Sequence, residues 1–549
     1  QRALLPVLDP RHPLRTSGAL VPIGDEPHDV STPWTASARI VGFLQGDDAL
    51  DPQIAAIGGI VEIAQGVQYS SEQHALIARM QSWLVEGAAL TTILVEGAYR
   101  SGRRTAIAVA VAKSGRLAVS ADFARVPPRH AERVLAALRR EAMLLGAVPV
   151  LANLDELWSR LAPGDETLLA LAAILDAWDG PLVVTATTAG VELRSERRTQ
   201  LHARWPLPDP ITRRTLWENA IGDAIGDVDL DVIAHRYDLG AGGIGAAARS
   251  AIHHASHAGR APTLDDVVAG VQDNIAERLG ELAKRVEIKQ EWSELVLPPE
   301  TLEDVSALVG RVRHAHFVLD RWGFRKKLAR GAGVAALFSG PPGTGKTMVS
   351  GLIARELQLE LYQVDLSRIV SKWVGETEKQ LAKVFEAAEA GHALLLFDEA
   401  DAWFAKRSAE VKSAVDRYAN LEVNYLLQRV ESFGGVVILT TNLDTSIDPA
   451  LRRRLASHIV FMRPETTERI DLWREMLTTG APVCRDVDLR VLAEEFQEMT
   501  GANIRNAVLT AAFLAADEGL EIGQNHLQRG ARTEYRAMGH MLQKSARRS

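Results

Sequence analysis

The sequence has little cysteine, few aromatic residues and no long apolar run, and these shortages exclude several classes of protein. A single cysteine, Cys484, cannot form an internal disulfide, so a disulfide scaffold is excluded and a reducing, cytoplasmic location is expected. No apolar run approaches the ~18 residues of a membrane helix, so we expect no membrane partner. Positive charge is not in excess either. The net charge of −8 argues against nucleic acid as a partner and leaves only a local basic groove open.

What the chain does have is length and an ordinary globular composition. Its 549 residues are too many for one compact domain, and 47% hydrophobic with 24% charged residues is typical of folded chains. The first residue is Gln1 rather than Met. We therefore expect a processed or truncated chain, and a lost signal peptide or preceding domain stays open.

The chain contains an internal repeat. Residues 93–126 and 336–369 both run from an apolar strand through a glycine-rich turn and a helix into a strand that ends in Asp-x-x-Arg. Further along, LWENA in the first half matches LWREM in the second, and DVDL occurs in both. Two copies of one module of roughly 250 residues fit this pattern.

Each module alternates strand-like apolar runs with helical patterns and then becomes mainly helical. This order predicts an α/β core with a parallel sheet, followed by a small helical lid. Residues 1–65 are predicted to form an N-terminal connector, and 66–285 the first module. The second module is predicted to have its α/β core over 286–463 and its lid and C-terminal tail over 464–549.

The second module carries a phosphate-binding loop. The segment GPPGTGKT fits the pattern G-x-x-x-x-G-K-[ST] and lies between an apolar strand and a helix, as such a loop requires. Glycines let backbone N–H groups approach the phosphates of ATP, Lys346 is predicted to reach the β- and γ-phosphates, and Thr347 to bind Mg²⁺. A glycine-rich structural turn is the alternative. The loop consists of Gly340, Pro341, Pro342, Gly343, Thr344, Gly345, Lys346 and Thr347.

Two further apolar strands end in residues suited to hydrolysis. The strand over 394–397 leads into Asp398, predicted to bind Mg²⁺ directly or through water, and Glu399, predicted to polarise the attacking water. The strand that starts at residue 436 ends at Asn442, which can help to orient that water if the two strands are neighbours. The alternatives are an ordinary charged strand end and an asparagine that only caps the next turn.

Together, GPPGTGKT, LLLFDEAD and TTN resemble the motifs of the AAA ATPases, which have two-part P-loop modules of this kind. The resemblance implies a ring, usually a hexamer, in which arginines of one subunit reach the γ-phosphate bound to its neighbour. Within DPALRRRLASHIVF, Arg453 and Arg454 best match these arginine fingers. A solvated basic run is the alternative.

Two more segments resemble functional parts of the same family. SKWVGE is similar to the first pore loop, in which Lys372, Trp373 and Val374 would grip a polypeptide substrate in the central channel. The alternative is that the tryptophan is a core aromatic. Gly501 and Ala502 resemble the lid motif that packs near the bound nucleotide.

The most specific resemblance is to ATPases encoded with extracellular contractile injection systems. It rests on DRYANLEVNYLLQR and on the segment around the predicted pore loop, and it is strong over 290–540 and weak over 1–285. It implies a homo-oligomeric ring that hydrolyses MgATP and remodels or threads a protein substrate, with injection-system components as candidate partners. A nucleic-acid motor and an ATP-binding assembly scaffold with little turnover are the alternatives.

The repeat alignment predicts that the first module has lost this chemistry. Arginine is bulkier than lysine and planar, so Arg103 is a poor substitute for the phosphate-binding lysine. An alternative register would place Asp155 and Glu156 at the carboxylate site. We therefore predict a degenerate AAA module that binds nucleotide weakly or not at all. Lys346, Thr347, Asp398, Glu399, Asn442 and Trp373 align in order with Arg103, Arg104, Ala152, Asn153, Thr187 and His130.

Overall fold

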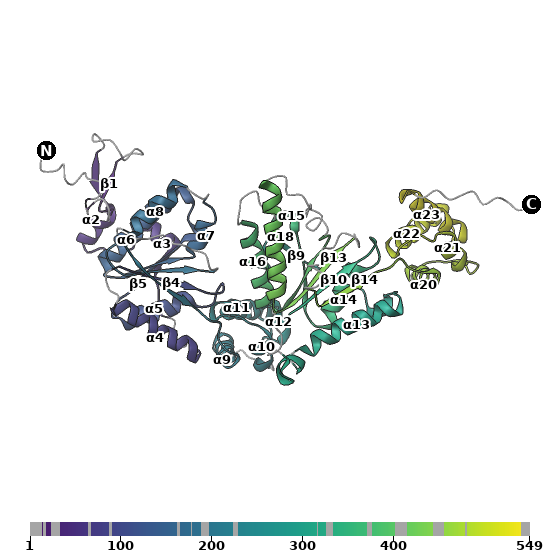
Figure 1. The fold of residues 1–549 in the computed structure, drawn as a ribbon, viewed down its shortest axis with the longest axis horizontal. Helices are drawn as coiled ribbons and strands as arrows, with labels where there is room; N and C mark the ends of the chain where they lie inside the picture. The colour runs from purple at the N-terminus through teal and green to yellow at the C-terminus, as the bar shows by residue number, and fades with distance from the viewer. Residues whose placement is uncertain are drawn as a thin grey trace, which may run out of the picture. The chain divides into compact units, whose positions relative to one another are not determined.

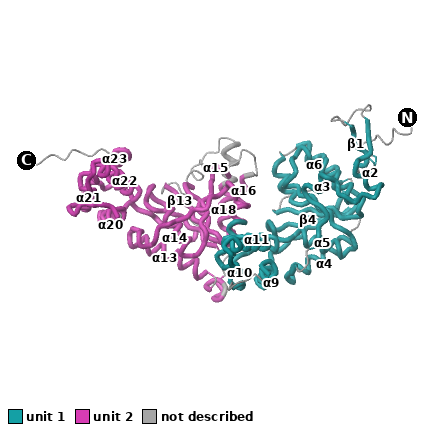
Figure 2. The backbone as a smooth tube through the Cα atoms, turned by 180° about the vertical axis from the view of Figure 1, so that it is seen from behind, with its two compact units in different colours: residues 1–274 teal, residues 275–549 magenta. Residues whose placement is uncertain are grey.

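The computed structural model divides the chain into two compact units, which are described separately below. Unit 1 comprises Gln1–Asn274 and unit 2 Ile275–Ser549 (Figure 2). No helix in the described part of the chain is long and apolar enough to cross a membrane. The structure describes residues 12, 14, 18–23, 33–63, 67–86, 90–161, 165–176, 178–187, 197–222, 229–315, 317–324, 333–369, 376–400, 414–442, 455–477 and 480–539.

Unit 1 is built on a six-stranded sheet with helices on both faces (Figure 1). The strand order is β3-β5-β6-β7-β4-β8, and all neighbouring pairs are parallel except the antiparallel pair β3–β5. The middle strands are apolar and buried along nearly their whole length, as a sheet covered on both faces requires. The strands are β3 (Gly58–Ile60), β4 (Thr91–Glu96), β5 (Ala118–Asp122), β6 (Val148–Ala152), β7 (Leu182–Ala186) and β8 (Thr199–Arg204).

The helices of unit 1 form an apolar core on each face of this sheet. Helices α4 (Ser71–Glu86) and α5 (Arg103–Lys113) cover one face. The opposite face carries α3 (Pro52–Ile57), α6 (Ala131–Leu145), α7 (Leu154–Trp158) and α8 (Glu166–Asp176). A hairpin of β1 (Leu20–Pro22) and β2 (Trp34–Ala36) precedes α2 (Ala38–Leu44).

Part of the predicted N-terminal connector packs against unit 1 through buried charges. Arg39 Nε donates a hydrogen bond to Glu141 Oε1 at 2.8 Å, and Arg140 pairs with Asp51 at 2.5 Å. All four side chains are less than a tenth exposed. Removing one partner of a buried ion pair typically costs about 3–5 kcal/mol, so residues 39–51 are firmly attached to α6.

Unit 2 repeats the topology of unit 1 strand for strand. Its sheet has the order β9-β11-β12-β13-β10-β14, with only the pair β9–β11 antiparallel. The predicted fold of two tandem α/β modules is therefore confirmed. Each sheet is mixed rather than wholly parallel, because a three-residue edge strand runs against the others. The strands are β9 (Ala283–Arg285), β10 (Val334–Ser339), β11 (Glu360–Val364), β12 (Ala393–Phe397), β13 (Val436–Thr441) and β14 (Ser457–Val460).

The helices of unit 2 also cover both faces of its sheet (Figure 1). Helices α13 (Pro299–Arg313) and α14 (Lys346–Glu356) contribute to one apolar core with β10 and β12. Among the described residues, the α/β part of unit 2 also contains the short α15 (Leu366–Ile369), α16 (Glu376–Ala390) and α18 (Ala414–Ser432).

Each core is followed by a lid in which four helices are described, and equivalent internal contacts occur in both lids. The first helix of each buries an arginine and a tryptophan one turn apart, Arg213 and Trp217 in unit 1 and Arg469 and Trp473 in unit 2. The second helix of each begins at an aspartate whose carboxylate accepts two backbone N–H bonds. The lid helices are α9 (Pro210–Ile221), α10 (Leu230–Arg236), α11 (Ala241–His257) and α12 (Leu264–Leu279), then α20 (Thr466–Met476), α21 (Leu489–Glu495), α22 (Gly501–Glu518) and α23 (Gln524–Ala537).

Candidate active site

The glycine-rich loop of unit 2 joins β10 to α14 in a conformation that needs glycine. Gly340, Gly343 and Gly345 have φ angles of +140°, +77° and +97°, which L side chains rarely adopt. A Cβ on Gly340 would lie 2.0 Å from the carbonyl oxygen of Phe461. The loop therefore has no side chain at these three glycines. Its backbone continues directly from Gly345 into α14.

Lys346 brings a positive charge into the middle of this loop. Its side chain is only 7% exposed, and Nζ donates to Gly340 O at 2.7 Å, Pro341 O at 2.9 Å and Asn442 Oδ1 at 3.0 Å. Asn442 follows β13, which pairs with β10 on one side and with β12 on the other. The sheet therefore brings Lys346 and Asn442 together, and it places β12 beside β13, as the predicted role of Asn442 requires.

Asp398 stands at the carboxyl end of β12, where ligands bind in open α/β sheets. Its Oδ1 accepts a hydrogen bond from the Thr440 hydroxyl. Its Oδ2 accepts from Gln363 Nε2 at 3.0 Å and lies 3.4 Å from Thr347 Oγ1. Two hard oxygen donors, one from the loop and one from the strand end, thus lie side by side in a half-buried position.

Glu399 is exposed and has a left-handed backbone, with φ at +53°. Its backbone N–H donates to Thr440 Oγ1 at 3.1 Å, so the same threonine holds both Asp398 and Glu399. A left-handed glutamate costs roughly 1–2 kcal/mol. Strain of this kind persists where surrounding structure enforces it, and it gathers at functional sites.

The lid of unit 2 contacts the loop at the two residues predicted for it. Ala502 N–H donates to Gly343 O at 3.3 Å. A Cβ on Gly343 would lie 2.6 Å from Thr500 Oγ1 and 2.8 Å from Ala502 Cβ. Gly501 and Ala502 begin α22, so this helix starts directly against the glycine-rich loop.

Five predicted site residues lie outside the described residues. They are the pore-loop residues Lys372, Trp373 and Val374 and the arginine-finger residues Arg453 and Arg454. Their roles stay predictions from the sequence. Conversely, Gln363 and Thr440 were not predicted, although each is a polar residue that follows apolar residues in its strand.

Comparison with known proteins finds two matching family models. Residues 336–463 match the family described as "ATPase family associated with various cellular activities (AAA)". This part of the chain is therefore an AAA ATPase domain. Residues 209–285 match the "Contractile injection system ATPase helical domain". The predicted resemblance to these ATPases is confirmed, but this match lies in the part of the chain for which the resemblance was judged weak.

The chain also resembles individual proteins over part of its length. It is 37% identical to "ATPase family gene 2 protein" of Schizosaccharomyces pombe over 33% of this chain and 22% of that protein. It is 31% identical to "Cell division cycle protein 48 homolog" of Archaeoglobus fulgidus over 42% of this chain and 33% of that protein. It is 31% identical to "ATP-dependent zinc metalloprotease FtsH 1" of Rhodopirellula baltica over 39% of this chain and 33% of that protein. The matches therefore span a third or less of these relatives.

An AAA domain implies a bound nucleotide and a divalent cation, and the residues of unit 2 fit both. Hydroxyl and carboxylate oxygens such as those of Thr347 and Asp398 are suitable ligands for Mg²⁺. The buried ammonium of Lys346 and the start of α14 supply the positive charge that phosphates need.

In unit 1 the residues at the corresponding positions bond to other groups of the protein. Arg103 is 6% exposed, and its guanidinium donates to the carbonyl oxygen of Ala186, inside the sheet. Asn153 has φ at +53°, like Glu399, and its N–H donates to Thr185 Oγ1 at 2.9 Å. These matching contacts support the alignment of Asn153 with Glu399.

The alternative register is not supported, because Asp155 has a different place in unit 1. It is 7% exposed, and its Oδ2 accepts from the backbone N–H of Thr187 at 2.9 Å and from the Thr187 hydroxyl. Thr187 stands where unit 2 has Asn442. Asn442 therefore contacts Lys346 in unit 2, whereas Thr187 at the same position of unit 1 bonds to the carboxylate of Asp155.

The lid of unit 1 contacts the altered loop through the same backbone hydrogen bond. Gly243 N–H donates to Arg100 O at 3.1 Å, which corresponds to the bond from Ala502 to Gly343. The position of the glycine in this bond differs between the units, since in unit 2 it is the loop residue Gly343 and in unit 1 the lid residue Gly243. In unit 1 the loop residue is Arg100 and the lid residues facing it are glycines, and a Cβ on Gly242 would lie 2.8 Å from Arg100 O.

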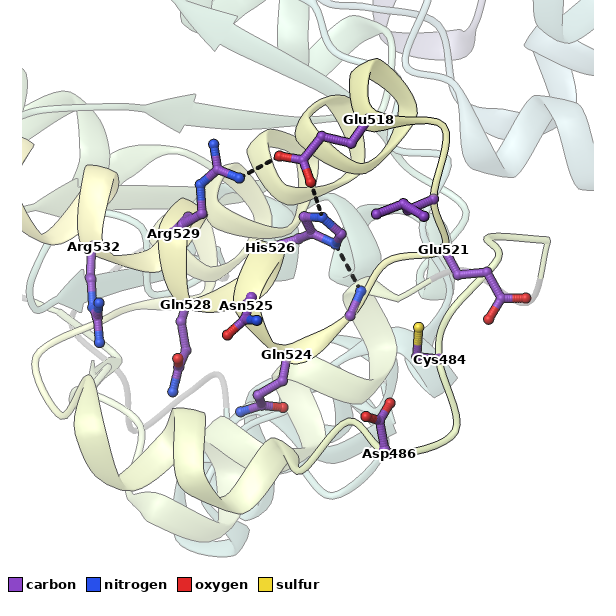
Figure 3. A pocket seen from close by; sticks show the side chains of 12 residues that line it. Cys484, Asp486, Glu518, Glu521, Gln524, Asn525, His526, Gln528, Arg529 and Arg532 are labelled. Atoms are coloured by element: carbon purple, nitrogen blue, oxygen red, sulfur yellow. Dashed lines mark hydrogen bonds and ion pairs between the residues drawn. The ribbon is translucent and has the colours of Figure 1, made fainter.

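A separate hollow of about 710 Å³ lies on the unit 2 lid and contains none of the predicted site residues (Figure 3). His526 Nδ1 accepts from the N–H of Gly523 at 3.0 Å, so its Nε2 donates to Glu518, at 3.0 Å. The hydrogen bonds that Glu518 accepts from His526 and from Arg529 lower the pKa of this carboxyl group. Burial raises the pKa of Cys484, which disfavours the thiolate form of this residue. The hydrogen bond from Gly523 to His526 caps the start of α23.

Proposed function

We propose that this AAA ATPase forms a homo-oligomeric, hexameric ring and hydrolyses MgATP in unit 2. Hydrolysis is coupled to remodelling or threading of a protein substrate during assembly or turnover of a contractile injection particle. One observation carries the ATPase part of the proposal: β10, β13 and β12 bring Lys346, Asn442, Thr347 and Asp398 to one edge of the sheet. The match of residues 209–285 supports the link to injection systems.

The described residues divide the work at the nucleotide. Lys346 and the loop N–H groups bind the phosphates, while Thr347 and Asp398 hold the cation. When bound, Mg²⁺ neutralises charge on the β- and γ-phosphate oxygens. Glu399 takes up the proton of the attacking water, and Asn442 orients that water.

The ring supplies the remaining parts of the proposal. Arg453 and Arg454 complete the site of the neighbouring subunit, and such a residue is worth ~10³–10⁵ in rate where it has been measured. Lys372, Trp373 and Val374 line the channel and grip the polypeptide. Gly501 and Ala502 transmit the state of the nucleotide to the lid, because Ala502 donates a backbone hydrogen bond to Gly343.

A trapped variant tests this function. We expect Glu399→Gln to bind ATP, to hydrolyse it at least 100-fold more slowly, and to retain a protein substrate in a pull-down from the native host. Lys346→Ala should bind no ATP, because the loop loses its buried ammonium. Glu156→Gln in unit 1 is the matched control and should behave as the wild type. Stimulation of turnover by RNA or DNA, rather than by protein, would replace the proposal with a nucleic-acid motor.

A further inference from the structure

Gln363 is a polar side chain on a strand whose neighbouring residues are buried. It lies on β11, between the buried residues Tyr362 and Val364, and pairs with Leu396 of β12. Its amide Nε2 donates to Asp398 Oδ2 at 3.0 Å. A glutamine at this position buries less apolar surface than an aliphatic residue would. Its contact with the Asp398 carboxylate therefore indicates a role for the amide.

The carboxylate of Asp398 is held from both sides. Strand β12 lies between β11 and β13, and each neighbour sends one donor to it. The Thr440 hydroxyl bonds Oδ1, and the Gln363 amide bonds Oδ2. Two donors on different oxygens fix the rotation of the carboxylate, and the fixed position keeps Oδ2 within 3.4 Å of Thr347 Oγ1.

Comparison of the two units distinguishes the role of the Thr440 hydroxyl from that of the Gln363 amide. Thr440 aligns with Thr185, which unit 1 keeps because its hydroxyl still receives the N–H of Asn153. Gln363 aligns with Ser120, and Asp398 aligns with Ala152. Where the carboxylate is lost, the amide is lost with it, although the threonine and the strand order are kept.

We propose that Gln363 is a positioning residue for the divalent-cation site of unit 2. Its amide orients the Asp398 carboxylate so that Oδ2 and Thr347 Oγ1 face the same cation. The inference rests on the proposed function, because it requires that unit 2 binds a nucleotide with a divalent cation. It adds a residue outside the sequence motifs that define the site.

The test separates cation binding from nucleotide binding. With the full chain, the affinity for a fluorescent ATP analogue is measured in EDTA and then across a Mg²⁺ titration, and Mn²⁺ binding is followed by electron paramagnetic resonance. In Gln363→Leu, affinity in EDTA should stay within about twofold of the wild type. The cation concentration for half-saturation should rise about tenfold, as expected when a hydrogen bond to a charged group is lost.

Two controls keep the result specific. Gln528→Leu removes a similar bond from a glutamine amide to a carboxylate, that to Glu495 at 3.2 Å in the lid, and should leave the cation titration unchanged. Should Gln363→Leu fail to fold, Gln363→Ser carries the residue that unit 1 has and serves the same test. An unchanged cation titration in a folded variant, or equal losses with and without Mg²⁺, would overturn the inference. A wild-type chain that binds no ATP would instead overturn the proposed function.

Discussion

Glu399 shows how a single residue can be kept against its own conformational preference. Its φ of +53° is unfavourable for glutamate, while unit 1 has Asn153 in the same conformation, and asparagine tolerates it better. The sequence could identify Glu399 by its place after an apolar strand. It could not show the strain, because the strain depends on Thr440 holding the backbone N–H from a neighbouring strand.

We therefore expect Glu399→Asn to lose turnover while gaining about 0.5–1 kcal/mol of unfolding free energy. The asparagine relieves the backbone and cannot act as a base. Denaturant unfolding, followed by tryptophan fluorescence, would measure the gain, and phosphate release the loss. Glu399→Gln is the control, with the same loss of turnover and no added stability. If both variants unfold at the same denaturant concentration, the left-handed backbone of Glu399 does not lower the stability of the wild type.

At the scale of elements, the sequence predicts what lies in one continuous segment. The glycine-rich loop and the ends of β12 and β13 could be found because each is an apolar run followed by a fixed pattern. The contacts of Gln363 and Thr440 with Asp398 cross between strands, and no local pattern encodes them. The antiparallel edge strands β3 and β9 were missed for a related reason, since three residues carry no periodicity.

The contact between loop and lid gives a prediction for Gly343. We expect Gly343→Ala to lower turnover at least tenfold and to cost about 1–3 kcal/mol, because the new Cβ meets Thr500 and Ala502 and φ is positive. Adding Ala502→Gly should restore part of the activity, since unit 1 has glycine on the lid side. Turnover and thermal unfolding of the single and double variants would measure this. A double variant no better than Gly343→Ala would show that the contact with Ala502 is not responsible for the loss.

For the whole molecule, the two units show one strand order with different residues at the ends of the strands. Arg103→Ala should leave ATP turnover within about twofold of the wild type and should destabilise unit 1 by about 1–3 kcal/mol, through the lost bond to Ala186. Phosphate release and calorimetry measure the two effects separately. A large loss of turnover at unchanged stability would mean that unit 1 takes part in catalysis.

Assembly into a ring yields the last prediction. If Arg453 and Arg454 act on the nucleotide of a neighbour, a monomer cannot complete its own site, so activity per chain should rise cooperatively with concentration. Chains with Arg453→Ala and Arg454→Ala should be inactive alone, as should Glu399→Gln chains. In mixed rings, the wild-type Glu399 of one chain meets the wild-type arginines of its neighbour, so mixing should restore turnover. Mixed rings that form, as shown by mass photometry or tagged co-purification, yet stay inactive in every proportion would refute the assignment. Constant activity per chain down to a proven monomer would refute it as well, because each chain would then supply every group that its own site needs.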